Sequence, residues 1–249
     1  MTPLDLAAVA AAGVAAGAVN TIAGAGSLLT FPVLLAVGLP PLSANVTNDI
    51  GVIPGNASGA VGFRHELSGQ APRLARLLPI AAVGSLVGAV LLLAFSARTF
   101  EIVAPVLLLV ASGVTAAQPA LARWVQRSHH QGHGPLRLVI LAIAVYGGYF
   151  GTGIGVLFFA ALGVFIDDTA SRLNATKQVL ALVSNGVAGI LFAFVAPVYW
   201  AAAAALAVGS ALGGPIGARL SRRISAPALR AVVCTVGVAA AVYLAAKQW

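Results

Sequence analysis

The chain has 249 residues, of which 60% are hydrophobic and only 8% are charged. Since soluble domains carry about 25% charged residues, this composition excludes an ordinary soluble protein. Residues 6–48 and 178–218 contain no charged side chain, and each stretch exceeds the about 20 apolar residues that one bilayer span needs. We therefore predict an all-α integral membrane protein with several spans.

The net charge of +8 does not indicate a nucleic-acid partner, because no Lys- or Arg-rich block is present and membrane proteins collect basic residues in cytoplasmic loops. The single cysteine, Cys234, lies in an apolar run, so we expect neither a disulfide framework nor a cysteine metal site. We predict no cofactor and no metal. The central histidines His129, His130 and His133 are interpreted as part of a solvated linker.

The first predicted element, residues 4–38, is an apolar segment interrupted by Gly24-Ala25-Gly26. As one straight helix it would be roughly 50 Å long, whereas the hydrocarbon core of a bilayer is about 30 Å thick. It is too short for two full spans. We predict two half-helices that form a re-entrant hairpin and return to the same side of the membrane. Three ordinary spans follow, at about 44–63, 77–97 and 100–117.

The second half repeats this plan after residues 118–137, which we predict to be a cytoplasmic linker. Residues 138–166 form a second apolar segment, broken within the sequence GTGIG at 151–155. Spans at about 173–196, 198–218 and 227–246 complete this half. The chain is therefore divided into two repeats, residues 1–117 and 138–249.

The two halves share glycine and polar residues at a constant offset. Gly24 and Gly153 are 129 residues apart, and the same offset relates four further pairs: Gly26 and Gly155, Asn45 and Asn174, Thr47 and Thr176, and Asn56 and Asn185. Asn and Thr matches are more specific than glycine matches in a chain rich in Ala and Gly. Internal repeats are typical of secondary transporters.

The distribution of the 14 Lys and Arg residues favours hairpins over single crossings. If each long segment crossed the membrane once, 7 basic residues would lie on each side; if each is a hairpin, 12 lie on one side and 2 on the other. The positive-inside rule favours the second arrangement. With three spans after each hairpin, the two repeats are inverted relative to each other, and both termini are predicted to lie outside.

The glycine breaks are predicted to form a substrate site. Half-helix ends leave backbone N–H groups unpaired, such groups favour anions, and glycine lets a ligand approach the backbone closely. Gly24, Gly26, Ser27, Gly153 and Gly155 are therefore candidate substrate-binding residues. The alternative is that these small residues only allow tight packing between helices.

The repeated polar residues are candidate donors to the oxygen atoms of a substrate, or they hydrogen-bond neighbouring helices instead. They are Asn45, Thr47, Asn56, Asn174, Thr176 and Asn185. Lys177 is a candidate anion contact, although a lysine at a helix end could instead reach the membrane interface. Asn48, 129 residues earlier, is included as a neutral donor. Asp49 is a candidate proton-coupling carboxylate; alternatively, it caps a helix or pairs with Lys177.

The chain resembles the TauE/SafE sulfite exporter family, also called the toluene sulfonate uptake permease family. In the first half the resemblance rests on NTIAGAGSLLTFPVLLAVGLPPLSANVTN and PGNASGAVGFR. In the second half it rests on GGYFGTGIGVLFFAAL, NATKQVLALVSN and GSALGGPIGARL. The resemblance covers nearly the whole chain, and it implies a membrane transporter of small sulfur-containing or other organic anions.

We therefore predict a secondary transporter of small anions, with sulfite or an organosulfonate first, in the bacterial plasma membrane. A passive anion channel is the alternative. An enzyme is not expected, because the predicted spans offer no histidine and a single carboxylate. The expected partners are the anion, the lipid bilayer and protons as the coupling ion, with no nucleic acid; no oligomeric state is predicted.

Overall fold

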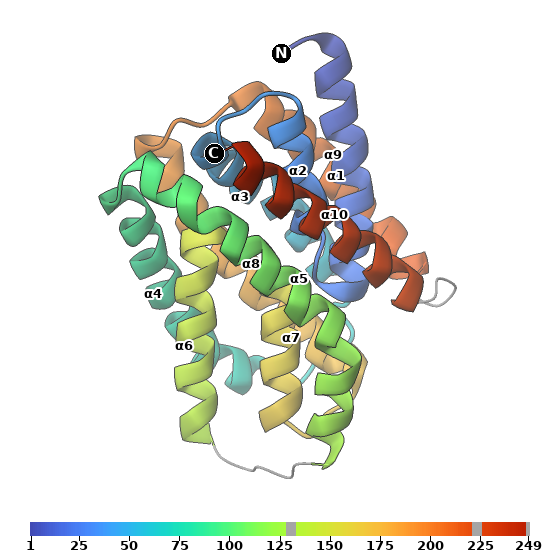
Figure 1. Ribbon diagram of the computed structural model, residues 1–249. Coiled ribbons are helices and arrows are strands. Elements are labelled where there is room, and N and C mark those ends of the chain that lie inside the picture. The colour runs from blue at the N-terminus through green and yellow to red at the C-terminus, as the bar shows by residue number, and fades with distance from the viewer. Residues whose placement is uncertain (128–132, 221–225, 248–249) are drawn as a thin grey trace.

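The computed structural model describes residues 1–127, 133–220 and 226–247, and every regular element in these ranges is an α-helix (Figure 1). The helices are α1 (Pro3–Ala23), α2 (Ser27–Ala36), α3 (Pro41–Gly62), α4 (Ala71–Ala94), α5 (Ala97–Arg127), α6 (His133–Phe150), α7 (Ile154–Phe165), α8 (Ala170–Val195), α9 (Trp200–Leu220) and α10 (Ala226–Lys247). Of the central histidines, His129 and His130 lie outside the described residues, whereas His133 begins α6.

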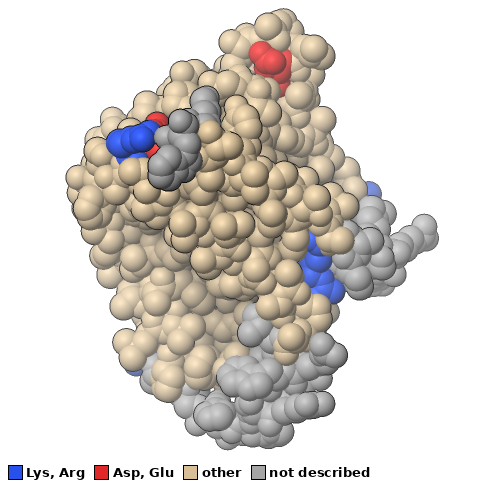
Figure 2. Space-filling view, viewed as in Figure 1, with Lys and Arg blue, Asp and Glu red and all other residues tan. Residues whose placement is uncertain are grey.

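Five of these helices are long and apolar enough to cross a membrane. They are α1, α4, the Ala97–Ala120 part of α5, α8, and the Trp200–Gly217 part of α9. Large apolar side chains on them are openly exposed, as with Phe194 on α8 and Val208 on α9. The face shown in Figure 2 is almost free of charged residues. The chain is therefore an all-α, multi-pass membrane protein, as its composition predicted.

Helix α3 is equally long but much more polar, and it packs among α1, α2, α5, α8 and α9. Its polar side chains are buried: Ser43, Asn45, Thr47, Asn48, Asp49 and Asn56. The opposite arrangement, with these groups facing lipid, would leave them without hydrogen-bond partners. The span predicted at 44–63 is therefore an internal helix of the bundle, and α8 packs directly on it.

The first long apolar segment is broken at the predicted glycines. Gly24 ends α1 in a left-handed conformation with φ 79°, and its N–H donates to the Asn20 carbonyl oxygen at 2.9 Å. Only glycine adopts this conformation without steric cost, which is why helices often end at one. Helix α2 begins at Ser27 and turns back along α1 (Figure 1).

The second break separates α6 from α7, and here Gly151 and Gly153 are both left-handed, with φ 69° and φ 80°. Figure 1 shows that the α1–α2 pair and the α6–α7 pair enter the molecule from opposite ends. Their turns meet in the middle, where a Cβ atom added to Gly24 would lie 2.7 Å from the carbonyl carbon of Gly155.

The two halves of the chain are joined by close glycine contacts. Helix α1 packs on α9, and α6 packs on α4. A Cβ atom on Gly17 would lie 2.3 Å from the Ser210 carbonyl oxygen, and one on Gly88 would lie 2.0 Å from the Val145 carbonyl oxygen. Small residues at membrane helix interfaces allow this close approach of two backbones. Each half therefore depends on the other for its packing.

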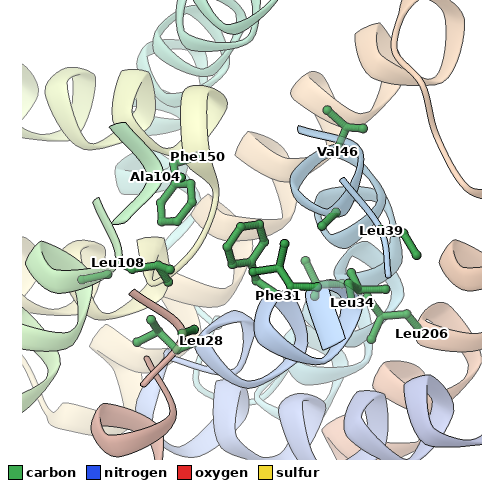
Figure 3. Packing of buried hydrophobic residues seen from close by; sticks show 14 of the residues in the cluster. Leu28, Phe31, Leu34, Leu39, Val46, Ala104, Leu108, Phe150 and Leu206 are labelled. Carbon is green, nitrogen blue, oxygen red and sulfur yellow. The ribbon is translucent and has the colours of Figure 1, made fainter. Parts of the chain in front are cut away.

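The short helix α2 is anchored in a hydrophobic cluster (Figure 3). Leu28, Phe31 and Leu34 are fully buried, and the Phe31 ring packs edge-on against Phe150 with 5.5 Å between the ring centroids. Such a pair contributes about 0.5–1.5 kcal/mol beyond its buried area. Because Phe150 is the last residue of α6, this contact holds α2 beside the second break.

The helices extend further than the predicted spans around the middle of the chain. Helix α5 runs to Arg127 rather than 117, and α6 begins at His133 rather than 138. Residues 116–127, AAQPALARWVQR, consist mostly of good helix formers, so the helix continues beyond its apolar part. The segment predicted as a linker, residues 118–137, is therefore helical at both ends.

Candidate functional site

The N-termini of the two short helices meet at one point. Ser27, the first residue of α2, and Ile154, the first residue of α7, line the same small cavity. The two helix ends are also bonded, because the Gly153 N–H donates to the Ser27 hydroxyl oxygen at 3.0 Å. Each helix N-terminus carries the positive end of a dipole, so this point favours a negative charge.

The cavity between the breaks is small, and its lining mixes apolar and uncharged polar residues. Its volume is about 10 Å³, which is room for about one water molecule. Its lining consists of Ala16, Gly17, Asn20, Ser27, Val52, Gly55, Asn56, Ile154, Ala181, Asn185 and Ser210. Three amides and two hydroxyls thus line this small space.

Asn56 and Asn185, which the sequence pairs by its constant offset, both line this cavity, one from α3 and one from α8. The Asn20 side-chain amide donates to the Asn56 Oδ1 atom. The Asn56 Nδ2 atom and the Asn185 Oδ1 atom are buried without a hydrogen-bond partner. Unpaired buried polar atoms are costly, so these two are available to a ligand.

Asn45 and Asn174 are not at the cavity but hold the ends of the broken helices. Asn45 Nδ2 donates to the Tyr149 carbonyl oxygen of α6 at 3.2 Å. Asn174 Nδ2 donates to the Thr21 carbonyl oxygen of α1 at 3.0 Å. In both cases an asparagine of one half donates to a carbonyl group at a helix end of the other half. Such a carbonyl group has no hydrogen-bond partner within its own helix.

Thr47 and Thr176 also bond segments of the opposite half, away from the cavity. The Tyr199 N–H, just before α9, donates to Thr47 Oγ1 at 3.0 Å. Thr176 Oγ1 donates to Gln70 Oε1, just before α4, at 2.7 Å. The structure thus brings Asn56, Asn185 and Ser27 together and places the other repeated polar side chains at contacts between the halves.

Lys177 is buried, with 1% of its surface exposed, and does not reach the membrane interface. Its Nζ atom donates to the Asn20 carbonyl oxygen at 2.8 Å, at the C-terminal end of α1. Since the Asn20 side chain lines the cavity, Lys177 is one residue removed from it. At the paired position, Asn48 Oδ1 accepts a hydrogen bond from Thr30 Oγ1 at 2.5 Å.

Asp49 is fully buried in the middle of α3, so it does not cap a helix. It forms no ion pair with Lys177, since the ion pairs among the described residues involve other groups. Both of its carboxylate oxygens lack a hydrogen-bond partner. Its Oδ1 atom lies against Gly151, where an added Cβ atom would be only 1.9 Å away. The carboxylate therefore faces the second break.

Gly26 and Gly155 are packed against backbone rather than open to the cavity. A Cβ atom on Gly26 would lie 2.1 Å from the Ala16 carbonyl oxygen, and one on Gly155 would lie 2.5 Å from the Gly24 carbonyl oxygen. These glycines bring the breaks together, and any contact with a ligand requires the helices to separate.

The sequence profile of the family described as sulfite exporter TauE/SafE matches residues 9–244. The chain belongs to the TauE/SafE family. It is 24% identical over 231 residues to the probable membrane transporter protein ORF9 of Sinorhizobium sp, which covers 93% of this chain and 88% of that protein. It is 28% identical over 212 residues to the probable membrane transporter protein YfcA of Escherichia coli K12, with 82% and 76% covered. No solved structure matches the chain.

Two polar cavity residues of this TauE/SafE protein were not predicted, namely Asn20 and Ser210. Asn20 is the sole side-chain amide in residues 4–38 and precedes the first break by one turn, which is a signal that sequence reasoning could have used. Ser210 lies in the repeated AVGS motif, and its hydroxyl donates to the Gly51 carbonyl oxygen at 2.8 Å. Its partner Ser85 donates to the Ser184 carbonyl oxygen at 2.5 Å.

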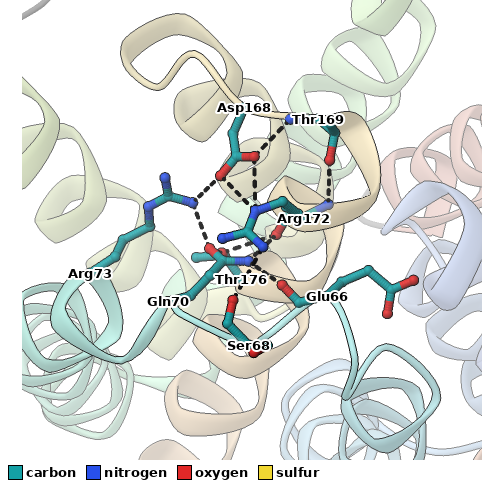
Figure 4. Close-up of polar contacts among 8 residues, drawn as sticks. All are labelled: Glu66, Ser68, Gln70, Arg73, Asp168, Thr169, Arg172 and Thr176. Atoms are coloured by element: carbon teal, nitrogen blue, oxygen red, sulfur yellow. Dashed lines mark hydrogen bonds and ion pairs between the residues drawn. The ribbon is translucent and has the colours of Figure 1, made fainter.

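A second polar site of this protein lies where the α3–α4 and α7–α8 connections meet (Figure 4). We call it the loop cluster; its members are Glu66, Ser68, Gln70, Arg73, Asp168, Thr169, Arg172 and Thr176. The Asp168 carboxylate accepts from Arg73 Nη1 at 2.8 Å and from Arg172 Nε at 3.0 Å. Burial opposes its ionisation, but hydrogen bonds from Arg73, the Thr169 N–H and Arg172 outweigh burial and lower the pKa of Asp168.

Proposed function

We propose that the protein is a secondary transporter that binds a small anion in the cavity between the two breaks. The observation that carries this proposal is the convergence of α2 and α7, whose first residues Ser27 and Ile154 both line the cavity. Two helix N-termini turn the positive ends of their dipoles toward one ligand. The unpaired Asn56 amide adds a side-chain donor.

The proposed substrates are sulfur oxyanions such as sulfite, organosulfonates and other small organic anions. Membership of a family described as sulfite exporters supports a sulfur-containing anion. No charged side chain lines the cavity, so the anion is held by helix ends and amides, with Lys177 adding positive charge through its contact with Asn20. This arrangement suits a small, compact anion better than a bulky one.

The small volume of the cavity supports a carrier rather than an open channel. About 10 Å³ holds one water molecule but not a sulfite ion, so substrate binding requires the helices around the cavity to move apart. A carrier opens its site to one side at a time, whereas a passive channel needs a continuous path. The loop cluster joins the α3–α4 and α7–α8 connections to each other, which supports a closed conformation at this end of the bundle.

We also propose that the two halves are inverted repeats, with both termini outside and the predicted linker, residues 118–137, on the cytoplasmic side. Arg172 Nη1 donates to the Ser68 carbonyl oxygen at 3.2 Å, so the connections before α4 and before α8 lie on one side of the bundle. This contact supports the hairpin arrangement, because the alternative with single crossings would separate the two connections by a membrane. The opposite entry of the two helix pairs in Figure 1 supports inversion.

Asp49 is proposed to couple transport to a cation gradient. Its complete burial without a partner supports this role, since an ionisable group inside a membrane protein is costly and is usually functional. The sequence predicts a proton as the coupling ion, because a lone carboxylate is enough to carry one.

The proposed function is tested with purified protein in two assays. In the first, thermal unfolding is measured with sulfite, thiosulfate, sulfoacetate, taurine and simple carboxylates, and at least one small anion should raise the unfolding temperature. In the second, uptake of that anion into proteoliposomes should saturate with concentration. Uptake that rises linearly without saturation would indicate the passive channel instead.

The cavity itself is tested with Asn185→Asp, a change that keeps the shape of the side chain but adds a negative charge. Repulsion should abolish anion binding while the variant remains folded in the absence of ligand. Asn174→Asp is the control. It makes the same change outside the cavity, and the folded variant should retain anion binding. Unchanged binding by Asn185→Asp would exclude the cavity as the site.

A further inference from the structure

The two breaks differ in the charge placed beside them. The C-terminal end of a helix carries partial negative charge, which cations stabilise. At the first break this cation is built in: Lys177 Nζ donates to the Asn20 carbonyl oxygen of α1 at 2.8 Å. At the second break the corresponding position, 129 residues earlier, is Asn48, which supplies no charge.

The second break instead receives a negative charge. The Oδ1 atom of Asp49 lies against Gly151, which immediately follows the C-terminal end of α6. A helix C-terminus and a carboxylate thus lie together, and both carboxylate oxygens lack a partner. Apart from Asp49, Lys177 is the one acidic or basic side chain that is buried within the described residues, and it is occupied at the first break. The second break therefore lacks a positive charge.

Two further unpaired oxygens belong to residues next to the second break or to Asp49. Asn45 lies one turn before Asp49 on the same face of α3, and its Oδ1 atom is buried without a partner. Its Nδ2 atom fixes it to the Tyr149 carbonyl oxygen, two residues before Gly151. Thr152, directly after Gly151, has a buried and unpaired Oγ1 atom. Tyr146 holds this turn in place by donating to the Thr152 carbonyl oxygen at 2.8 Å.

We propose that Asp49, Asn45 and Thr152 form a binding site for Na⁺ at the second break. Carboxylate, amide and hydroxyl oxygens are the ligands that hard cations prefer, and broken helices of transporters commonly hold Na⁺ at their C-terminal ends. Bound Na⁺ then supplies at the second break the positive charge that Lys177 supplies permanently at the first. The inference rests on the proposed function in treating Asp49 as the coupling residue, and it makes Na⁺ the coupling ion in place of the proton.

The site is tested by thermal unfolding of the purified protein without any transported anion. NaCl is exchanged for choline chloride at constant chloride concentration and constant pH, up to 500 mM. The unfolding temperature of the wild type should rise by a few degrees with the logarithm of the Na⁺ concentration, since a ligand that binds only the folded state stabilises it by mass action. Asp49→Asn, which removes the unpaired charge, should remain folded and lose this response.

Two further variants make the result specific. Thr152→Val keeps the shape of the side chain and should shift the response to about tenfold higher Na⁺, as expected for the loss of one oxygen ligand. Asp168→Asn makes the same acid-to-amide change in the loop cluster and should keep the full Na⁺ response at a lower unfolding temperature. If Asp49→Asn fails to fold, the Thr152→Val comparison carries the test.

The proposal is overturned if Na⁺ leaves the wild type unchanged, or if Asp49→Asn and Thr152→Val respond as the wild type does. If the unfolding temperature of the wild type depends on pH but not on Na⁺, the proposal is also overturned, and the proton remains the coupling ion. Failure of anion binding is a separate result, because no transported anion is present in this assay. Asp49→Asn should still bind the anion that stabilises the wild type.

Discussion

Asp168 shows how one carboxylate can join two loops of the bundle. Its pKa is lowered, so its ionised form stabilises the folded state at pH values above the usual aspartate pKa of about 3.9, and this contribution is lost as the pH falls through the lower folded pKa. Asp168→Asn should therefore destabilise the protein by about 1–3 kcal/mol at neutral pH. The difference in unfolding temperature from the wild type should shrink below about pH 4. A difference that is the same at both pH values would contradict this role.

Lys177 should matter for anion affinity although it does not line the cavity. Lys177→Met removes the charge beside Asn20, and the loss of one charged contact at a desolvated site should weaken binding by roughly ten- to a hundredfold. Arg98→Met is the control, because the Arg98 side chain is 64% exposed and forms an ion pair with Glu101 in its own helix. Anion titration by thermal unfolding measures both. Equal affinities for the two variants would assign Lys177 to helix stabilisation alone.

Single residues of the site were only partly predictable from the sequence. The constant offset selected Asn45, Asn56, Asn174 and Asn185, but it gave no means of separating those that line the cavity from those that pair helix ends. That difference depends on which face of α3 or α8 each side chain occupies once the helices cross. Asn20 has no counterpart at the offset, since position 149 is a tyrosine, and was therefore missed.

Among the helices, the glycines at the breaks set how closely α1, α2 and α7 approach. Gly26→Ala and Gly155→Ala should each reduce the yield of folded protein, because the added methyl group would meet backbone at 2.1 Å and 2.5 Å. Gly113→Ala is the matched control: nothing lies within 4 Å of its added Cβ atom, so this change in α5 should be neutral or slightly stabilising. Size-exclusion chromatography of detergent extracts measures the folded fraction. Normal yield of both break variants would show that the helices can move apart freely.

The breaks were predictable because glycine and segment length both opposed a continuous helix. The internal position of α3 was harder to predict from the sequence, since a polar helix inside a bundle and a weakly apolar span look similar in composition. The full length of α5 was missed because apolarity marks where a helix crosses the membrane, whereas helix propensity decides where it ends.

For the whole molecule, the inverted arrangement predicts which loops share a side of the membrane. In a Cys234→Ala background, single cysteines at the exposed positions Ser68 and Ser171 should react with an impermeant reagent from the cytoplasmic side. A cysteine at the exposed Ser96 should react from outside. Accessibility in intact cells and inside-out vesicles provides the measurement. Labelling of positions 68 and 171 from opposite sides would contradict inversion.

The packing of α1 on α9 has a consequence for how the chain is made. Helix α1 is synthesised long before its partner α9, and Asn174, which pairs the Thr21 carbonyl group of α1, follows only on α8. Until then the nascent chain presents Gly13, Gly17 and an open helix end to lipid, where unpaired backbone groups are costly. These contacts therefore form late, and a chain truncated before α8 would leave the C-terminal end of α1 unpaired and its glycine surface without α9.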